Sequence, residues 1–294
     1  VIHASYSARM LAYRHAFHAG NHADVLKHLV LAQVLRYMGE KDKPYTLVDT
    51  HAGAGGYSLA GRYAQKRGEF ESGIGRLWDH PDLPAALADY VALVKQFNGG
   101  GALEQYPGSP GLAQMLLRPT DRLSLYELHP TDNRILESFL GQRPHTKVLM
   151  SDGFAGLQKE LPPPSRRGAV LIDPSYELKT DYAKVVGAVR ECLSRFAQGT
   201  VMVWYPQVQI VEAAQLPKRL MGAAKEAPKG WLHVTLHVHR GEGDGFGLHG
   251  SGMFVINPPF VLHDTLAALM PLLTELLGQY EGARFTLEQD LGRG

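Results

Sequence analysis

Residues 169–176 read Ala-Val-Leu-Ile-Asp-Pro-Ser-Tyr, and this stretch decides the fold that the sequence predicts. An uninterrupted apolar run that stops at Asp173-Pro174 is typical of a buried parallel strand. In open α/β sheets, ligands bind outside the carboxyl ends of the strands. We therefore expect Asp173 and Tyr176 to face a ligand crevice from the end of a rigid strand. Taken alone, the same residues also fit an ordinary strand that ends in a turn.

Strand-like runs alternate with helical stretches through the middle of the chain. Further runs end at Asp49, Glu127, residues 151–154 and Pro206, and helical stretches such as residues 180–196 separate them. This alternation predicts an α/β fold with a mostly parallel sheet.

The last part of the chain has a different pattern. Two runs, residues 231–238 and 251–256, are joined by a glycine-rich loop and predict an antiparallel hairpin at the sheet edge. Beyond residue 261 we expect a helix to about residue 280 and then a loose polar end.

A glycine-rich turn follows the first predicted strand, in residues 49–56, Asp-Thr-His-Ala-Gly-Ala-Gly-Gly. Glycines such as Gly53 let the backbone approach a cofactor closely, and no Gly-Lys-Ser/Thr follows that would make this turn a P-loop. Glu127 ends a second strand, where nucleotide-binding folds place the acid that binds ribose hydroxyls. The two features together favour a nucleotide-type cofactor.

Residues 57–106 separate this turn from Glu127 and have amphipathic helical patterns in pieces, notably at residues 84–97. Ordinary crossovers in α/β folds are shorter, so we interpret residues 57–106 as a helical insertion. Ser109 is expected to cap the helix that follows, with Pro110 in its first turn. The domain is expected to span residues 10–294, with Met10 as the natural start. Residues 1–9 are interpreted as a leader whose origin the sequence does not reveal.

The N-terminal part is rich in arginine and histidine. Asn21 is predicted to cap a helix, and the loop before it forms a local basic patch of the kind that contacts phosphates. His18 and His22 are four residues apart, as in some metal pairs. However, Gly20 and Asn21 make a continuous helix between them implausible, and there is no His-Glu-x-x-His pattern, so we expect no metal site.

Composition is that of an ordinary globular protein, with 294 residues, 45% of them hydrophobic and 20% charged. Cys192 is the one cysteine, so no internal disulfide forms, which fits a reducing cytoplasm. The sequence has no apolar run of membrane-span length and no visible secretory signal. A formal net charge of +1 gives no global argument for a nucleic-acid partner.

A specific resemblance is carried by six stretches in one order: residues 10–28 (MLAYRHAFHAGNHADVLKH), 49–55 (DTHAGAG), 106–110 (YPGSP), 127–130 (ELHP), 152–154 (DGF) and 166–176. Together they resemble the RlmJ (YhiR) family, which are S-adenosylmethionine-dependent 23S ribosomal RNA adenine-N6 methyltransferases. The similarity runs from residue 10 to about residue 259. Residues 173–176 also resemble the Asp-Pro-Pro-Tyr motif of amino-group methyltransferases, with Ser175 in place of the second proline.

This resemblance implies a Rossmann-like class I methyltransferase fold with an antiparallel C-terminal hairpin and a helical insertion. The implied catalytic residue is Asp173, and we expect Pro174 and Tyr176 to act with it. The implied cofactor site comprises Lys27, His28, His51, Ser109, Glu127, Asp152 and Gly153. We expect Gly53 and Asp173 to belong to it as well. The implied RNA contact is Tyr13, and we expect the neighbouring Arg14, His15 and His18 to contribute. The cofactor is expected to be S-adenosylmethionine without a metal, the partner 23S ribosomal RNA, and the protein a cytoplasmic monomer.

The chemistry of the motif explains these roles. Two acceptors, the Asp173 carboxylate and the Pro174 carbonyl, would localise the lone pair of an adenine N6, and Tyr176 would stack on the base. Ser175 keeps both acceptors and weakens only the preorganisation of the turn. A second motif, residues 257–260 (Asn-Pro-Pro-Phe), is followed by too few residues to complete a sheet, so we interpret it as the end of the last strand.

Other functions stay open at this point. They are a DNA adenine-N6 methyltransferase, a metal-dependent nuclease that uses the N-terminal histidines, and a nucleic-acid-binding or processing protein used in the catabolism of external DNA.

Overall fold

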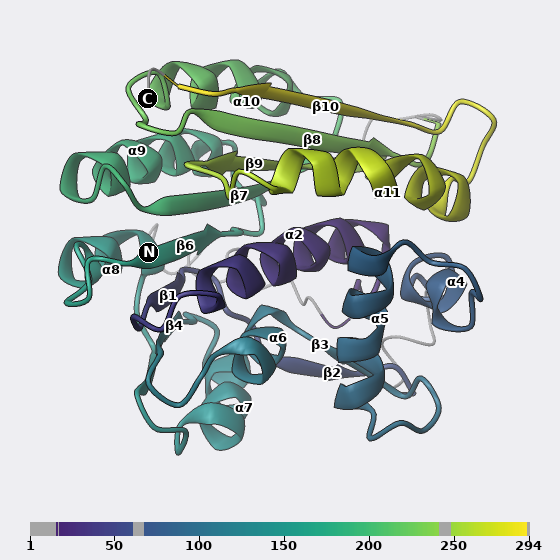
Figure 1. Cartoon of the computed structure of the whole chain (residues 1–294), viewed down its shortest axis with the longest axis horizontal. Coiled ribbons are helices and arrows are strands. Elements are labelled where there is room, and N and C mark those ends of the chain that lie inside the picture. The colour runs from purple at the N-terminus through teal and green to yellow at the C-terminus, as the bar shows by residue number, and fades with distance from the viewer. Residues whose placement is uncertain (1–15, 17, 61–67, 241–247, 293–294) are drawn as a thin grey trace, which may run out of the picture.

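An eight-stranded sheet divides the molecule into three layers (Figure 1). This computed structural model describes residues 16, 18–60, 68–240 and 248–292. The strand order is β10-β8-β9-β7-β6-β1-β4-β5. The strands are β1 (Thr46–Asp49), β4 (Arg122–Tyr126), β5 (Thr146–Leu149), β6 (Gly168–Ile172), β7 (Thr200–Gln207), β8 (Trp231–His237), β9 (Gly250–Ile256) and β10 (Arg284–Asp290).

The chain changes direction across the sheet beside β1. It moves outward from β1 through β4 to β5, then crosses back to β6 and β7, and these five strands are parallel. β1 and β6 are therefore neighbours, with Asp49 opposite Leu171 in the register. Such a switch point leaves a crevice at the carboxyl edge of the sheet. Asp49 and Asp173 both lie at that edge. The five parallel strands confirm the predicted α/β fold with a mostly parallel sheet.

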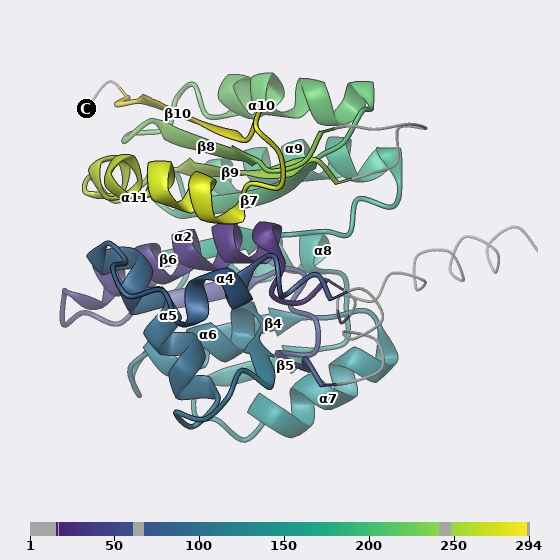
Figure 2. The same cartoon turned by 90° about the vertical axis from the view of Figure 1, so that its right-hand side faces the viewer.

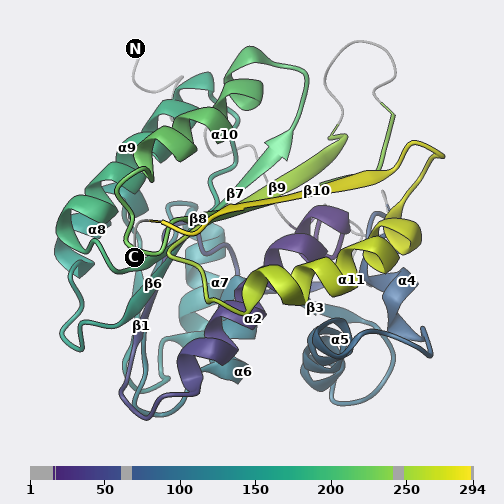
Figure 3. The same cartoon turned by 45° about the horizontal axis from the view of Figure 1, so that its top comes forward.

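Helices cover both faces of the sheet, which explains why every residue of β6 is buried (Figure 3). Leu171 packs into one core cluster, and its neighbours Val170 and Ile172 pack into the other. The first cluster lies under α2 (His22–Gly39), α6 (Ser109–Leu116), α7 (Pro130–Leu140) and α11 (Leu262–Leu277). The second lies under α8 (Gly153–Glu160), α9 (Lys179–Arg195) and α10 (Val211–Ala223).

Helix α2 is buried on almost all sides. Its predicted cap is confirmed, because the Asn21 side chain accepts hydrogen bonds from the backbone N–H groups of Ala23 and Asp24. The helix contacts α6 and β9, and it brings Lys27 and His28 to the carboxyl edge of the sheet. Among the described residues, no helix is long and apolar enough to span a membrane.

Between β1 and α6, the chain forms a small unit beside α2 (Figure 2). Its elements are β2 (Gly56–Ser58), α4 (Ile74–Trp78), α5 (Ala85–Phe97) and β3 (Gln105–Pro107). β2 and β3 pair as a two-stranded antiparallel ribbon, with Tyr57 opposite Tyr106. Residues 57–106, which the sequence predicted to form a helical insertion, therefore also contribute to a two-stranded ribbon. This ribbon connects the unit to the glycine turn and to α6.

Three local predictions were wrong. β8 and β9 pair in antiparallel fashion as predicted, but β9 lies inside the sheet, between β7 and β8. The C-terminal end is not loose, because β10 pairs along its whole length with β8 and forms the sheet edge. Ser109 does not cap α6, because the N-cap is Gly108 and the Ser109 hydroxyl donates instead to Asp49.

Candidate active site

A pocket opens at the carboxyl edge of β1, β4 and β6, where the topology predicts a ligand crevice. It lies between α2, the glycine turn and the start of α8. Its lining residues are Lys27, His28, Thr50, His51, Ala52, Gly53, Tyr57, Gly108, Ser109, Tyr126, Glu127, Leu128, His129, Asp132, Asp152, Gly153, Phe154, Asp173, Pro174, Ser175, Asp181 and Lys184. All nine residues that we expected at the cofactor site are in this set.

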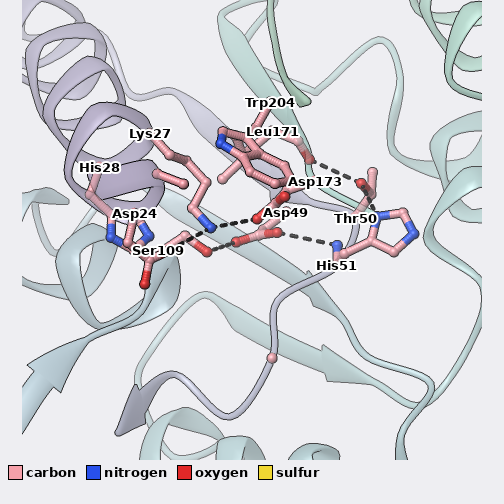
Figure 4. A network of polar contacts seen from close by, with 12 residues as sticks. Asp24, Lys27, His28, Asp49, Thr50, His51, Ser109, Leu171, Asp173 and Trp204 are labelled. Atoms are coloured by element: carbon pink, nitrogen blue, oxygen red, sulfur yellow. Dashed lines mark hydrogen bonds and ion pairs between the residues drawn. The ribbon is translucent and has the colours of Figure 1, made fainter. Parts of the chain in front are cut away.

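The carboxylate of Asp173 is paired with a buried lysine (Figure 4). Lys27 Nζ lies 2.6 Å from Asp173 Oδ2 and 3.0 Å from Asp24 Oδ1, and its side chain is 5% exposed. Burial by itself lowers the pKa of Lys27, but the carboxylates of Asp173 and Asp24 outweigh it and raise the pKa above the usual value. Lys27 is therefore a permanent cation that fixes one oxygen of Asp173.

A second buried carboxylate, Asp49, ends β1 and is completely buried. Ser109 Oγ donates to Asp49 Oδ2 at 2.6 Å, and the backbone N–H of His51 donates to Asp49 Oδ1 at 3.2 Å. Burial raises the pKa of Asp49 to about 7, since removing a carboxylate from water disfavours its charged form. These bonds tie the glycine turn to the start of α6.

His51 is held in one tautomer by its neighbour. The Thr50 hydroxyl lies 3.0 Å from the Leu171 carbonyl oxygen and 2.8 Å from His51 Nδ1. A carbonyl only accepts, so both contacts are hydrogen bonds when Thr50 donates to Leu171 and accepts from His51 Nδ1–H. Burial lowers the pKa of His51 to about 4, which keeps the ring neutral near pH 7. Its Nε2 is then an acceptor.

Glu127 braces the glycine turn. Its carboxylate accepts hydrogen bonds from the backbone N–H groups of Gly53, at 2.8 Å, and His129, at 2.6 Å. Burial raises the pKa of Glu127 above its usual value. Gly53 has a φ of +64°, and a Cβ there would lie 2.2 Å from the Tyr57 hydroxyl, so the turn requires glycine at this position.

The start of α8 forms the opposite wall. Asp152 is its N-cap and accepts from the backbone N–H of Phe154 at 2.8 Å. A Cβ on Gly153 would lie 2.1 Å from the Thr50 carbonyl oxygen, so only glycine lets the helix approach β1 this closely. The Phe154 ring meets the His51 ring at a centroid distance of 4.8 Å.

Not every predicted site residue lines the pocket. Pro174 and Ser175 do, but Tyr176 is 8% exposed and packs into the core against Tyr182, with ring centroids 4.7 Å apart. Its hydroxyl donates to the Trp204 carbonyl, and its φ is +53°. Its predicted stacking on a base therefore stays a prediction.

The predicted RNA contacts fall mostly outside the described residues. Tyr13, Arg14 and His15 lie there, whereas His18 is described. His18 Nδ1 lies 2.9 Å from Glu69 Oε2, away from the pocket-lining set. Within the ranges that the structure describes, no group of three or more His, Cys, Asp or Glu residues is arranged to hold a metal ion.

The second motif, residues 257–260, lies at the opposite end of the strands from the pocket. Because β9 is antiparallel to β7, Asn257 follows the end of β9 near the amino end of β7. Its side-chain amide donates to the carbonyls of Ala197 and Gly199, and its Oδ1 accepts from the Lys229 backbone N–H. These bonds give Asn257 a structural role. The motif does follow a strand, but the interpretation of that strand as the last one was wrong, because β10 comes after β9 in the chain.

Comparisons with known proteins identify the family. The family model described as Ribosomal RNA large subunit methyltransferase D, RlmJ, matches residues 42–287. The chain is 46% identical over 264 residues to Ribosomal RNA large subunit methyltransferase J of Escherichia coli, an alignment that covers 90% of this chain and 93% of that protein. This chain belongs to the RlmJ family.

Two further proteins are similar to this chain over most of its length. The Haemophilus influenzae protein of the same name is 44% identical and covers 95% of this chain and 98% of its own. A crystal structure of a Legionella pneumophila protein superposes with a TM-score of 0.82 at 34% identity, covering 92% of this chain and 98% of that one. Membership makes the protein an S-adenosylmethionine-dependent ribosomal RNA methyltransferase with a class I methyltransferase fold.

The pocket suits this cofactor chemically. Glu127 has a carboxylate that could accept from a ribose diol, and Leu128 and Phe154 present apolar surface that could hold an adenine. Lys27 and His28 lie at the wall formed by α2. Sequence reasoning missed the pairing of Lys27 with Asp173 and the part that Asp24 plays in it. Asp24 lies three residues before Lys27 on the predicted helix, and this spacing is a signal that could have found their ion pair.

Proposed function

We propose that the protein transfers a methyl group from S-adenosylmethionine to the exocyclic N6 of an adenine in 23S ribosomal RNA, without a metal. The observation that carries this proposal is the position of Asp173-Pro174 at the carboxyl end of β6, with Lys27 bound to one oxygen of Asp173. Bound S-adenosylmethionine supplies a methyl group that is already activated by its sulfonium. The protein therefore has to orient and activate the nitrogen.

N6 of adenine is a weak nucleophile because its lone pair is delocalised into the ring. Lys27 contacts Asp173 Oδ2, and we assign the other oxygen, Oδ1, to one N–H of the base. The Pro174 carbonyl is assigned to the second N–H. Two acceptors in these places favour tetrahedral geometry at N6 and localise its lone pair. As positive charge develops on N6, the fixed carboxylate stabilises it and then accepts the proton that the methylated nitrogen loses.

The substrate adenine must leave its stack to reach this edge of the sheet. An unpaired or extruded adenine costs less to present than one in a duplex. The aromatic Tyr13 and its neighbours Arg14 and His15 are proposed to contact the RNA around it. We further propose that the protein acts as a monomer in the cytoplasm, where ribosomal RNA is available.

The test combines calorimetry with mass spectrometry. We expect the protein to bind S-adenosylmethionine and to produce N6-methyladenosine in a protein-free 23S ribosomal RNA fragment, with no change when a chelator is added. A matched DNA fragment serves as the comparison substrate. Methylation of DNA in place of RNA, or binding of RNA without methyl transfer, would refute the proposal in favour of the DNA methyltransferase or the nucleic-acid binder.

A further inference from the structure

A chain of buried hydroxyl groups leads from the unit between β1 and α6 into the pocket. The Tyr90 hydroxyl, on α5, lies 2.6 Å from the Tyr106 hydroxyl, on β3. The Tyr106 hydroxyl in turn lies 2.8 Å from Nδ1 of His28, on α2. Both tyrosines are completely buried and His28 is 1% exposed, so water does not substitute for any of these contacts.

The direction of the hydrogen bonds follows from counting protons. Each hydroxyl donates once, and within the described part of the chain Tyr106 is the partner of the Tyr90 hydroxyl. If Tyr106 donated to Tyr90, the buried Tyr90 proton would have no acceptor, which costs about 1–3 kcal/mol. The satisfied arrangement is therefore the other one, in which Tyr90 donates to Tyr106 and Tyr106 donates to His28 Nδ1.

This direction fixes the state of the imidazole. A ring nitrogen that accepts a hydrogen bond carries no proton, so the proton of neutral His28 is on Nε2. An imidazolium would need a proton on Nδ1 as well, and that proton would reverse the chain and leave Tyr90 without an acceptor. The tyrosine pair thus selects the neutral Nε2–H form and makes Nε2 a donor.

We propose that Tyr106 and Tyr90 are positioning residues that hold His28 as a neutral Nε2–H donor to the α-carboxylate of S-adenosylmethionine. This inference rests on the proposed function. His28 lines the pocket, and the methionine part of the cofactor offers one acceptor, its carboxylate, beside an ammonium that only donates. A fixed donor at this wall therefore recognises the carboxylate, in contrast to His51, whose Nε2 accepts.

Nitrogen chemical shifts of ¹⁵N-labelled histidine test the tautomer directly, with His28→Gln used to assign the signal. The wild type should show His28 protonated at Nε2. Tyr90→Phe should keep that tautomer, because Tyr106 still donates to Nδ1. If the hydrogen bonds ran in the opposite direction, Tyr90→Phe would remove the acceptor of the Tyr106 proton and switch the tautomer of His28. An Nδ1–H signal in the wild type, or a switch in Tyr90→Phe, would overturn the inference.

Calorimetry tests whether His28 recognises the α-carboxylate of S-adenosylmethionine. Tyr106→Phe should weaken S-adenosylmethionine binding about tenfold, the size expected for one hydrogen bond to a charged group. Binding of decarboxylated S-adenosylmethionine should not change. The matched control is Tyr45→Phe, which removes a buried hydroxyl that donates to the Leu35 carbonyl away from the pocket. It should change neither affinity.

The outcomes separate the two proposals. Equal losses for both ligands in Tyr106→Phe, or no loss, would show that the tyrosines only support the fold. In that case the wild type still binds S-adenosylmethionine and methylates RNA, and the proposed function stands. A wild type that does not bind S-adenosylmethionine would instead remove the proposed function. If Tyr106→Phe does not fold, the tautomers of the wild type and of Tyr90→Phe still decide the direction of the chain.

Discussion

Lys27 Nζ lies 2.6 Å from Asp173 Oδ2, so the residue that follows β6 is joined to a helix residue 146 positions earlier in the sequence. The ammonium is buried between Asp173 and Asp24. A buried ion pair of this kind is costly to break, because the remaining charge has no water to solvate it. The same contact therefore holds α2 on the sheet edge and orients the proposed catalytic carboxylate.

Replacing Lys27 with methionine should lower the free energy of unfolding by about 3 kcal/mol, because the carboxylates of Asp24 and Asp173 lose the buried cation that both contact. Urea denaturation at pH 7 measures this change. Lys147→Met is the control, since Lys147 is exposed and lies 3.8 Å from Glu160, and such a surface pair contributes less than about 1 kcal/mol. Adding Asp24→Asn to Lys27→Met should restore part of the stability. Equal stability of the Lys27 and Lys147 variants would contradict the buried pair.

Asp173→Asn should reduce the single-turnover rate of methyl transfer by at least about 100-fold, the usual effect of removing one preorganised electrostatic group. Binding of S-adenosylmethionine should change little. The variant should also be less stable, because Lys27 keeps only Asp24. Rapid-quench measurements with labelled cofactor give the rate.

Asn257→Ala is the contrasting variant. It removes bonds to Ala197, Gly199 and Lys229 at the opposite end of the strands from the pocket, so it should lower stability and leave the transfer rate of the folded protein near normal. If Asp173→Asn turns over normally while Asn257→Ala loses the chemistry, the wrong motif was chosen.

Glu127→Gln should weaken S-adenosylmethionine binding about 10- to 100-fold, because a neutral amide replaces a charge-assisted acceptor of the ribose hydroxyls. Glutamine retains one carbonyl acceptor for the backbone N–H of Gly53 or His129, so the turn is better preserved than in an alanine variant. Calorimetry measures the affinity. Glu160→Gln is the control, since Glu160 does not itself line the pocket and accepts from the hydroxyls of Ser124 and Tyr126. An unchanged dissociation constant would remove Glu127 from the cofactor site.

Buried histidines should make the protein less stable as the pH falls below about 6.5. Burial lowers the pKa of His233 to about 4, below its value of 6.5 in the unfolded chain, so the unfolded state binds a proton that the native state does not. Stability is therefore present above pH 6.5 and is lost towards pH 4, at about 1.4 kcal/mol per pH unit for this group.

The variant His233→Gln isolates this effect. It retains a polar partner for the Tyr205 hydroxyl, which lies 2.8 Å from His233 Nε2, but it does not titrate. Urea midpoints between pH 4.5 and 7 should fall less steeply with decreasing pH in the variant than in the wild type. Parallel pH profiles would show that His233 is not the cause.

The double variant Tyr13→Ala with Arg14→Ala should raise the Michaelis constant for RNA or lower turnover, while S-adenosylmethionine affinity stays near that of the wild type. The reason is the local basic and aromatic character of this part of the sequence. Binding of an RNA hairpin to the wild type should also weaken as salt increases. Methylation of the RNA fragment at the wild-type rate across RNA concentrations would place the RNA path elsewhere.

The sequence by itself determined the parallel sheet and the edge at which the site lies. These follow from local rules, because an apolar run that ends at Asp173 or a glycine turn after Asp49 has the same meaning in any α/β sheet. The sequence did not predict that β9 lies inside the sheet or that β10 covers its edge. Strand order depends on which apolar faces are left uncovered once the chain has packed, and no local pattern records this.

Only the tertiary structure decided the partners of the site residues. Lys27 meets Asp173, Ser109 meets Asp49, and Tyr90 reaches His28 through Tyr106 across gaps of 16 to 146 residues. Hydrogen bonds and ion pairs act over about 3 Å, so they depend on how helices and strands are placed against each other. Residue types show which groups need a partner when they are buried, and packing alone selects that partner.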